Sequence, residues 1–533
     1  MRQSGPSRPP APPSRAGRIR LGVLLAAVAV ISGALLLPVP PALAQALEGK
    51  VTRITLDNGM RFLVARRGVA PVFAANLRFR VGSADDPGGG SGLAHLFEHL
   101  AFKGTSAIGT RDAKKEAGIL DAMDRAVMDL LRELDRGGSA DAPRLKDLRQ
   151  ELASLQSSLQ EITVKDELSQ ILTGNGATGL NASTSSDLTS YVVSLPANRL
   201  ELWCALESAR LRDPVLREFY SERDVVMEER RMRIDNQPQG KLYEQLLLTA
   251  FQAHPYRSPT AGFLSDLEHL TRPAAMEFRR RHYLPGNAVG ALAGDVDTVA
   301  AEGLIRRYFG GIPAGPAPSG PVTAEPPQTG ERRITVEFDA EPQLMIAFHK
   351  AVWPSPDDPV FQVIDSLLTS GRTSRLFRRL VLESRVATDV YSLQAPGDRY
   401  PNLFLIGAIP RAPHTPAEVE AGILQEVRRL ATEPVEEREL QKIRNQVEAS
   451  FLYPLRSNAG LASQLSYFEI MTGDWKNLGV YKEALLATTP ARVQEIARRT
   501  FVSSTLTVAV LARPQAGSGA AGSGAPGSPG DAR

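Results

Sequence analysis

A stretch rich in proline and glycine, IPAGPAPSGPVTAEPPQTGE at residues 312–331, divides this chain into two halves. Proline and glycine interrupt helices and strands, and a run of this kind is typical of a linker between domains. The chain has 533 residues, which is longer than one ordinary hydrophobic core accommodates. We therefore predict a domain at 45–311 and a second at 332–514, joined by this linker.

Both halves mix strand-like and helix-like segments, which indicates an α+β protein. The first half opens with a hairpin around Asn58 and Gly59 and continues with the strand-like FAANLRFRVGS at 73–83. The second half has the strand-like segments QLMIAFHKA at 343–351 and NLFLIGAIP at 402–410. The similar order of strands and helices suggests a duplication, although no sequence repeat is detectable.

Residues 112–162 differ from the rest of the first half because they are helical throughout. One stripe of apolar residues recurs at alternating spacings of three and four, as in a heptad seam: Leu145, Leu148, Leu152, Leu155, Leu159 and Ile162. A second stripe precedes it, and the turn-like GGSADAP at 137–143 separates the two. We predict an antiparallel helical hairpin, which either docks a partner or packs only on itself. A further long helical region is expected from Ala197 to about Arg233.

The two ends of the chain have the composition of unfolded or processed segments. Residues 1–44 combine arginines, an apolar run from Leu21 to Leu37 and a small-residue cleavage pattern at Ala42 to Ala44, which is typical of an export signal. We therefore predict a signal peptide at 1–44 and a periplasmic or secreted protein. An uncleaved signal would instead leave the chain membrane-associated. Residues 515–533 are rich in Gly, Ala and Ser and are expected to be disordered.

Charge and cysteine content exclude two classes of protein. The formal net charge is +3, and residues 1–44 hold five arginines and no acid, so the remainder carries −2. The predicted mature chain therefore has no basic excess of the kind that binds nucleic acid. Cys204 is the single cysteine, which excludes an intrachain disulfide, and its apolar helical surroundings favour a place in the core.

The sequence SGLAHLFEHLAFKGT at 91–105 places three ionisable groups on a short apolar helix. His95 and His99 are four residues apart, so their imidazoles face the same way and suit one Zn²⁺. Glu98 lies beside that face, where it can serve as a general base toward a water. The pattern H-x-x-E-H is a metallopeptidase signature. The alternative is a chance spacing of two histidines, against which the enclosed carboxylate argues.

A catalytic zinc site needs a third protein ligand. The candidate segment is YSERDVVMEERRMRID at 220–235, where Glu222 and Glu229 are seven residues apart and share a helix face. Spacing alone does not choose between Glu228 and Glu229. A solvated charged helix would have the same composition.

Three separated motifs occur in a fixed order: HLFEHLAFKGT, GLNASTSSDLTSY and ERDVVMEE. With them, residues 48–514 resemble the pitrilysin-type metallopeptidases of the insulinase superfamily, M16. The resemblance implies two related α/β domains of the mitochondrial-processing-peptidase type that form a clam-like cleft. The hairpin at 112–162 is then an insertion in the first domain, and it explains the long interval between His99 and Glu229.

The resemblance also implies roles for particular residues. His95, His99 and Glu229 become the ligands of one Zn²⁺ per chain, Glu98 becomes the general base, and Glu222 supports a ligating histidine from behind. The ligand types would also accept manganese or cobalt. The implied activity is direct hydrolysis of peptides or unfolded segments by a zinc-activated water.

The N-A-x-T motif implies a substrate-binding strand. Asn181, Ala182 and Thr184 would line the cleft and bind the peptide as an added strand. Whether such an enzyme removes presequences or degrades peptides is left open by the sequence.

One family feature is missing from the second half. Many relatives carry an Arg and, seven residues later, a Tyr that help bind substrate, and the corresponding positions here hold Val381 and Thr388. Arg385 and Tyr391 lie nearby but lack the family spacing. This indicates the zinc-bearing subunit of a two-chain peptidase whose partner carries the Arg/Tyr pair, or a homodimer. The alternative function is a weakly active or non-catalytic scaffold subunit.

Overall fold

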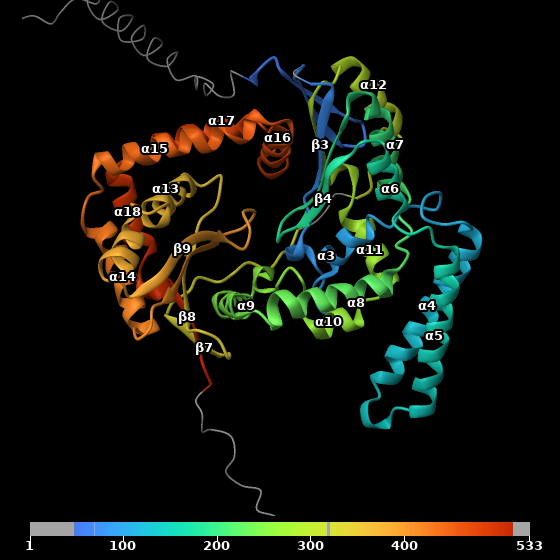
Figure 1. Cartoon of the computed structure of the whole chain (residues 1–533), viewed down its shortest axis with the longest axis horizontal. Coiled ribbons are helices and arrows are strands. Elements are labelled where there is room, and N and C mark those ends of the chain that lie inside the picture. Colours follow the sequence, from blue (N-terminus) through green and yellow to red (C-terminus); the bar gives the residue numbers. More distant parts are fainter. Residues whose placement is uncertain (1–46, 69, 317–319, 515–533) are drawn as a thin grey trace, which may run out of the picture.

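The computed structural model describes residues 47–68, 70–316 and 320–514, which form two lobes side by side (Figure 1). The predicted signal peptide at 1–44 and the predicted disordered tail at 515–533 lie outside the described residues. Within those residues, no helix is both long enough and apolar enough to span a bilayer.

The first lobe is built on a six-stranded sheet in the order β1-β2-β6-β3-β5-β4. Its strands are β1 (Val51–Thr55), β2 (Arg61–Arg66), β3 (Val72–Phe79), β4 (Thr178–Thr184), β5 (Thr189–Pro196) and β6 (Ala288–Gly294). Neighbours run antiparallel except β2 and β6, which are parallel. All seven residues of β6 are buried, as expected for a central strand covered on both faces.

The second lobe has a five-stranded sheet in the order β7-β11-β8-β10-β9. Its strands are β7 (Arg332–Glu337), β8 (Gln343–Lys350), β9 (Ala387–Ala395), β10 (Asn402–Pro410) and β11 (Leu506–Ala512). Only β7 and β11 run parallel. This order repeats that of β2-β6-β3-β5-β4, with the parallel pair in the same place. The predicted α+β fold with two related halves is confirmed.

Helices cover both sheets. Those of the first half are α3 (Leu93–Leu100), α4 (Ala113–Leu134), α5 (Ala142–Ile162), α6 (Glu167–Gly174), α7 (Leu200–Arg212), α8 (Phe219–Arg230), α9 (Pro238–Ala250), α10 (Leu264–His269), α11 (Arg272–His282) and α12 (Thr298–Phe309). Those of the second half are α13 (Asp358–Thr369), α14 (Pro416–Thr432), α15 (Glu437–Leu452), α16 (Asn458–Thr472), α17 (Asn477–Leu486) and α18 (Pro490–Thr500).

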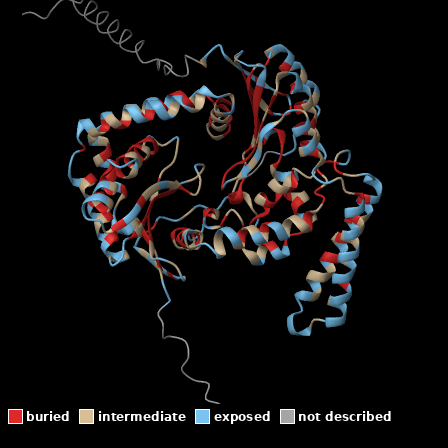
Figure 2. Cartoon of the chain, viewed as in Figure 1, coloured by how far each residue is buried: buried red, intermediate tan, exposed pale blue. Residues whose placement is uncertain are grey.

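The two halves exchange one helix each. Helix α9 packs Leu242 and Leu246 against the second sheet, where they share a core with Leu403 and Leu405. Helix α16 packs against the first sheet in the same way, in a core formed by Leu63, Ala65, Ala291, Ala293, Leu461, Ala462, Leu465 and Trp475. Each sheet therefore buries its second face with a helix from the other half, which fixes the lobes relative to one another (Figure 2).

Charged groups also join the lobes. The buried Glu469 on α16 pairs with Arg53 and with Arg61, the latter at 3.1 Å, and Arg399 donates to Asp85 at 3.1 Å. Because the Glu469 side chain is fully buried, loss of its arginine partners would leave an unpaired charge in the interface.

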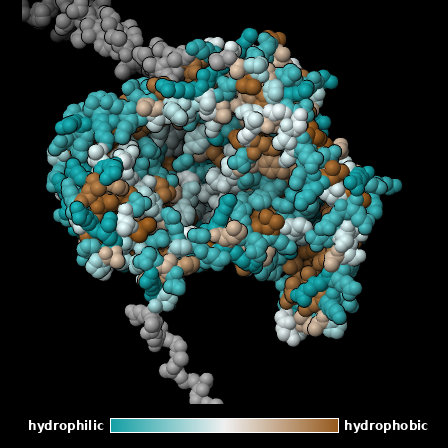
Figure 3. All heavy atoms as spheres, in the orientation of Figure 1, coloured by the Kyte–Doolittle hydropathy of each residue, from teal (hydrophilic) through white to brown (hydrophobic). Residues whose placement is uncertain are grey.

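The predicted helical hairpin is present as α4 and α5, which pack on each other and project from the first lobe (Figure 1). Asp112 and Asp141 cap the two helices by accepting hydrogen bonds from backbone N–H groups. The side chains of Met128 and Leu134 are 39% and 40% exposed. Apolar residues are also visible on the face of the hairpin shown in Figure 3.

The long helical region expected from Ala197 to Arg233 is wrong in one respect. Helix α7 ends at Arg212, and residues 213–218 are not helical before α8 begins at Phe219. Pro214 cannot continue a helix, and Leu216 and Glu218 have positive φ angles of 53° and 58°. Cys204, in contrast, is buried as expected, and burial raises the pKa of its thiol to about 12.

Candidate active site

Helix α3 carries the H-x-x-E-H motif, and its start is fixed by a carboxylate. Asp86 accepts hydrogen bonds from the backbone N–H groups of Gly92 and Ala94, at 2.8 and 2.9 Å. Gly92 has φ +90°, and a Cβ there would lie 2.9 Å from the carbonyl oxygen of Ala261. The apolar residues of α3 face the core, which leaves its ionisable groups for the opposite side.

The structure brings together three of the side chains that the sequence singled out. His95, His99 and Glu229 each offer a ligand atom, and these atoms lie within 4.8 Å of one another. The Nε2 atoms of His95 and His99 lie 3.8 and 3.4 Å from the same carboxylate oxygen, Oε2 of Glu229. Glu228 is instead exposed and pairs with Arg231, so the structure places Glu229 and not Glu228 at the cluster.

The cluster fits a divalent metal ion. Ligands arranged tetrahedrally at Zn–N and Zn–O distances lie roughly 3.3–3.6 Å apart, close to the two spacings around Glu229. Two imidazoles and one carboxylate are also a donor set found in catalytic zinc sites. Burial lowers the pKa of His95 to about 4, which keeps its imidazole neutral and able to ligate near neutral pH.

Glu222 lies behind His99, as the sequence predicted for a supporting residue. The Nδ1 atom of His99 lies 3.3 Å from Oε2 of Glu222, so a proton on Nδ1 leaves Nε2 free to face Glu229. Lys103 lies 2.6 Å from the other oxygen of Glu222. Burial opposes ionisation of Glu222, but hydrogen bonds from His99 and Lys103 outweigh it and lower the pKa of this carboxyl.

Replacing Glu222 with Gln tests this support. We expect the affinity for Zn²⁺ to fall about 10- to 100-fold, because His99 loses the carboxylate that orients its ring. Competition with a chromogenic zinc chelator measures it. Glu218→Gln is the matched control, since Glu218 pairs with Lys103 but not with His99. An equal loss of zinc affinity in both variants would mean that Glu222 acts through Lys103 and not through His99.

Glu98 lies beside the three ligand atoms and has its own partner. The hydroxyl of Thr184 on β4 donates a hydrogen bond to its Oε2 at 2.5 Å. Burial raises the pKa of Glu98, although the hydrogen bond from Thr184 opposes the rise. The sequence predicted substrate binding for Thr184. Its hydroxyl is engaged with Glu98, so a contact with substrate stays a prediction.

A cleft of about 870 Å³ opens in front of the cluster. Its lining includes the following residues: His95, Glu98, His99, Glu229, Asn181 and Ala182 of β4, Tyr243 and Glu244 of α9, and Pro396 after β9. Because β4 pairs only with β5, its other edge is unpaired within the described sheet. An extended peptide can add to such an edge.

Arg233 is a charged lining residue that the sequence reasoning missed. Arg233 lies 2.6 Å from Oε1 of Glu229, the oxygen that faces away from the histidines. The two residues are four apart, a spacing that pairs charges on a helix and was a usable signal. Arg233 is thus placed to hold Glu229 in one orientation.

The two residues considered as substitutes for the missing Arg/Tyr pair are not brought to the cleft. Neither Arg385 nor Tyr391 is among the described residues that line it. The hydroxyl of Tyr391 accepts a hydrogen bond from Gln239 at 2.9 Å, and Arg385 is exposed.

Fold and site together define a two-lobed protein with a cluster of metal-ligand side chains facing its cleft. Family models described as "Insulinase (Peptidase family M16)" and "Peptidase M16 inactive domain" match residues 61–122 and 269–447. "Zinc protease PqqE" of Helicobacter pylori is 26% identical over 476 residues, covering 88% of this chain and 94% of that protein. The chain belongs to the insulinase, or M16, peptidase family.

Solved structures show the same fold. A protease from Helicobacter pylori superposes with a TM-score of 0.72 at 24% identity, covering 87% of this chain and 99% of that one. The first half of the periplasmic protease PqqL from Escherichia coli has a TM-score of 0.62 at 15% identity, covering 87% and 92%. The names of the relatives support a peptidase, and the matched second-half family is described as inactive.

Proposed function

We propose that this protein is a zinc-dependent endopeptidase whose catalytic groups are His95, His99, Glu229 and Glu98. The observation that supports this most directly is the convergence of three metal-ligand atoms within 4.8 Å, beside a carboxylate that is not needed as a ligand. His95 and His99 come from α3 and Glu229 from α8, 130 residues further on than His99. Such convergence of distant residues argues against chance spacing of the histidines.

Different residues of this chain have different roles in hydrolysis. A Zn²⁺ held by the two histidines and Glu229 would supply Lewis acidity toward a water and a carbonyl oxygen. Glu98 accepts the proton of the attacking water and returns it to the leaving amine. Thr184 holds the carboxylate of Glu98 at 2.5 Å, which limits the orientations it samples. Glu222 and Lys103 keep His99 in the tautomer that presents Nε2.

Peptide is bound by β4. Asn181, Ala182 and Ser183 line the cleft on an unpaired strand edge, so main-chain hydrogen bonds give affinity for extended segments of any sequence. This favours unfolded polypeptides and peptides over folded substrates.

A second chain is a further part of the proposal. The positions of the missing Arg/Tyr pair hold Val381 and Thr388, and neither Arg385 nor Tyr391 is among the described residues that line the cleft. A similar fold occurs as the first half of a longer protease, PqqL. We propose that an M16 partner that carries the pair completes the site, with a homodimer as the alternative assembly. Export to the periplasm, proposed from residues 1–44, agrees with the location stated for that relative.

Removal and return of metal test the function. We expect the purified chain to contain one Zn²⁺ and to cleave an unstructured peptide, either alone or with an M16 partner. A chelator should abolish cleavage, and one equivalent of Zn²⁺ should restore it. Full activity of the isolated monomer would contradict the need for a second chain. Bound zinc without hydrolysis in any combination would favour the scaffold alternative.

A further inference from the structure

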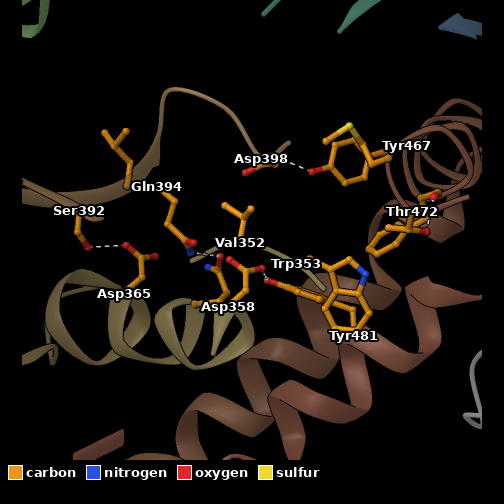
Figure 4. A pocket seen from close by; sticks show the side chains of 14 residues that line it. Val352, Trp353, Asp358, Asp365, Ser392, Gln394, Asp398, Tyr467, Thr472 and Tyr481 are labelled. Atoms are coloured by element: carbon orange, nitrogen blue, oxygen red, sulfur yellow. Dashed lines mark hydrogen bonds between the residues drawn. The ribbon is translucent and has the colours of Figure 1, made fainter. Parts of the chain in front are cut away.

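A second cavity, of about 420 Å³, lies in the second lobe (Figure 4). Its lining comes from α13, β9, α16 and α17 and from two connecting segments: Val352, Trp353, Asp358, Gln362, Asp365, Ser392, Leu393, Gln394, Asp398, Tyr467, Phe468, Met471, Thr472 and Tyr481. None of these residues belongs to the cleft at His95 and His99. The cavity is therefore a separate site that the proposed chemistry does not use.

The duplication of the fold places this cavity where the second lobe repeats the active site. Helix α13 follows β8 as α3 follows β3, and β9 is the edge strand of its sheet as β4 is of the first. The exchanged helices α9 and α16 also line the corresponding cavities. Three equivalent elements thus line both: the helix that follows β3 or β8, the edge strand and the exchanged helix.

A hydrogen bond repeats as well. In the first lobe, the hydroxyl of Thr184 on β4 donates to Glu98 on α3 at 2.5 Å. In the second lobe, the hydroxyl of Ser392 on β9 donates to Asp365 on α13 at 2.5 Å. A helix carboxylate is held by a hydroxyl from the edge strand in both, but the second cavity contains no histidine. The architecture of a ligand site is retained there without the metal ligands.

The charges of the second cavity favour a cation. Three carboxylates line it, from Asp358, Asp365 and Asp398, and no basic side chain is among the described residues of its lining. Lys350 neutralises Asp358 at 2.6 Å, whereas Asp365 and Asp398 have no ion-pair partner in the described part of the chain. Burial raises the pKa of Asp365, so an incoming cation would stabilise its ionised form.

Aromatic side chains complete the walls. Trp353 packs edge-on against Tyr481 with ring centroids 5.4 Å apart, and Tyr467 donates a hydrogen bond to Asp398 at 2.7 Å (Figure 4). Aromatic faces attract cations and suit the planar guanidinium group better than a compact ammonium. Gln362 and Gln394 add amide groups, joined to each other by a hydrogen bond of 3.1 Å.

The linings of the second cavity and of the active-site cleft approach each other at the end of β9. Gln394 lines the cavity and Pro396 lines the cleft. These residues are two apart in the chain, so their Cα atoms lie within about 7 Å of each other. A peptide held in the active-site cleft would thus lie near the second cavity.

We propose that this cavity is a specificity subsite that binds a cationic side chain of the substrate, arginine in preference to lysine. Asp365 and Asp398 bind the charge, and Trp353 and Tyr467 enclose the side chain. The subsite rests on the proposed function of the His95–His99 cleft. The expected substrates are then peptides that carry a basic residue at a fixed distance from the scissile bond.

Peptide binding to the full chain carrying Glu98→Gln tests the subsite, because binding is then measured without cleavage. The probes are fluorescein-labelled twelve-residue Ala/Ser peptides with one arginine moved along the sequence, and matched peptides with norleucine. We expect arginine at one or two positions to tighten binding at least about tenfold over norleucine, as for a charged hydrogen bond. Lysine should give a smaller gain.

Variants locate the effect. Asp365→Asn and, independently, Trp353→Leu should remove the preference for arginine, whereas Asp389→Asn, an exposed carboxylate on the same strand as Ser392, should keep it. In the Glu98-containing background, both cavity variants should still bind zinc and cleave an arginine-free peptide, which shows that they fold.

Two outcomes would overturn the inference. Equal binding of arginine and norleucine peptides at every position removes the subsite while leaving the proposed peptidase intact. Binding of arginine amide alone as tightly as the arginine peptide would make the cavity a site for a free small cation. Failure of all peptides to bind would instead contradict the proposed function on which the subsite rests.

Discussion

Replacing Glu98 with Gln should lower kcat for peptide cleavage by about 10²- to 10⁴-fold, the range for loss of a general base. The amide keeps the size of the side chain and its hydrogen bond to Thr184, but it cannot accept a proton from water. Zinc content should stay at the wild-type level, because the ligand atoms come from His95, His99 and Glu229. Steady-state kinetics and metal analysis of the same preparation measure both.

The controls for Glu98 separate chemistry from structure. Thr184→Val removes the hydroxyl that holds Glu98 but leaves the base in place, so it should cost less activity than Glu98→Gln. Thr184→Ser keeps a hydroxyl at this position and should therefore retain most of the activity that Thr184→Val loses. Loss of zinc from Glu98→Gln would contradict the assignment, because it would make Glu98 a ligand.

The second large expected effect distinguishes Glu229 from its neighbour Glu228. Glu229→Gln should weaken Zn²⁺ binding by more than about 100-fold, the upper range for losing only an outer partner of a ligand. Glu228→Gln should leave zinc affinity and activity close to wild type, because Glu228 is exposed and faces Arg231. Zinc affinity by chelator competition, with activity at saturating Zn²⁺, measures the difference.

The comparison is sharp because both variants change one carboxylate to an amide on the same helix turn. If Glu228→Gln lost zinc and Glu229→Gln kept it, α8 would have to be rotated by about 100° from its orientation here. If neither variant lost zinc, the third ligand would lie elsewhere, and the distances of 3.8 and 3.4 Å to Glu229 would have no role in binding metal.

Local sequence was sufficient wherever one short segment holds all the information. The H-x-x-E-H spacing puts His95 and His99 on one face of α3 because a helix repeats every 3.6 residues. The apolar stripes and the GGSADAP turn predict the α4–α5 hairpin, since those contacts are between neighbours in the chain. The hairpin around Gly59 also depends only on neighbouring residues. The φ angle of Gly59 is +86°, which glycine adopts without strain.

Some elements were missed because their burial depends on distant parts of the chain. Strand β9, ATDVYSLQA, is rich in polar residues and was not predicted, yet it pairs with β10 and lines the second cavity. The break at Pro214 was overlooked because the apolar pattern continues on both sides of it. The exchange of α9 and α16 between lobes has no local signature, since it depends on which sheet face is left uncovered.

By itself the sequence determined the class of chemistry: the identities of the histidines, of Glu98 and of a short set of candidate third ligands. It did so because metal-ligand spacing within one helix is a local property. Only the tertiary structure decided that Glu229 faces the histidines and that Thr184 holds Glu98. It also decided that the second cavity, which is lined by carboxylates and aromatic rings, has lining residues close in the chain to one that lines the cleft. These depend on the packing of α8, β4 and β9 against α3 and α13, and long-range packing is set by the whole core.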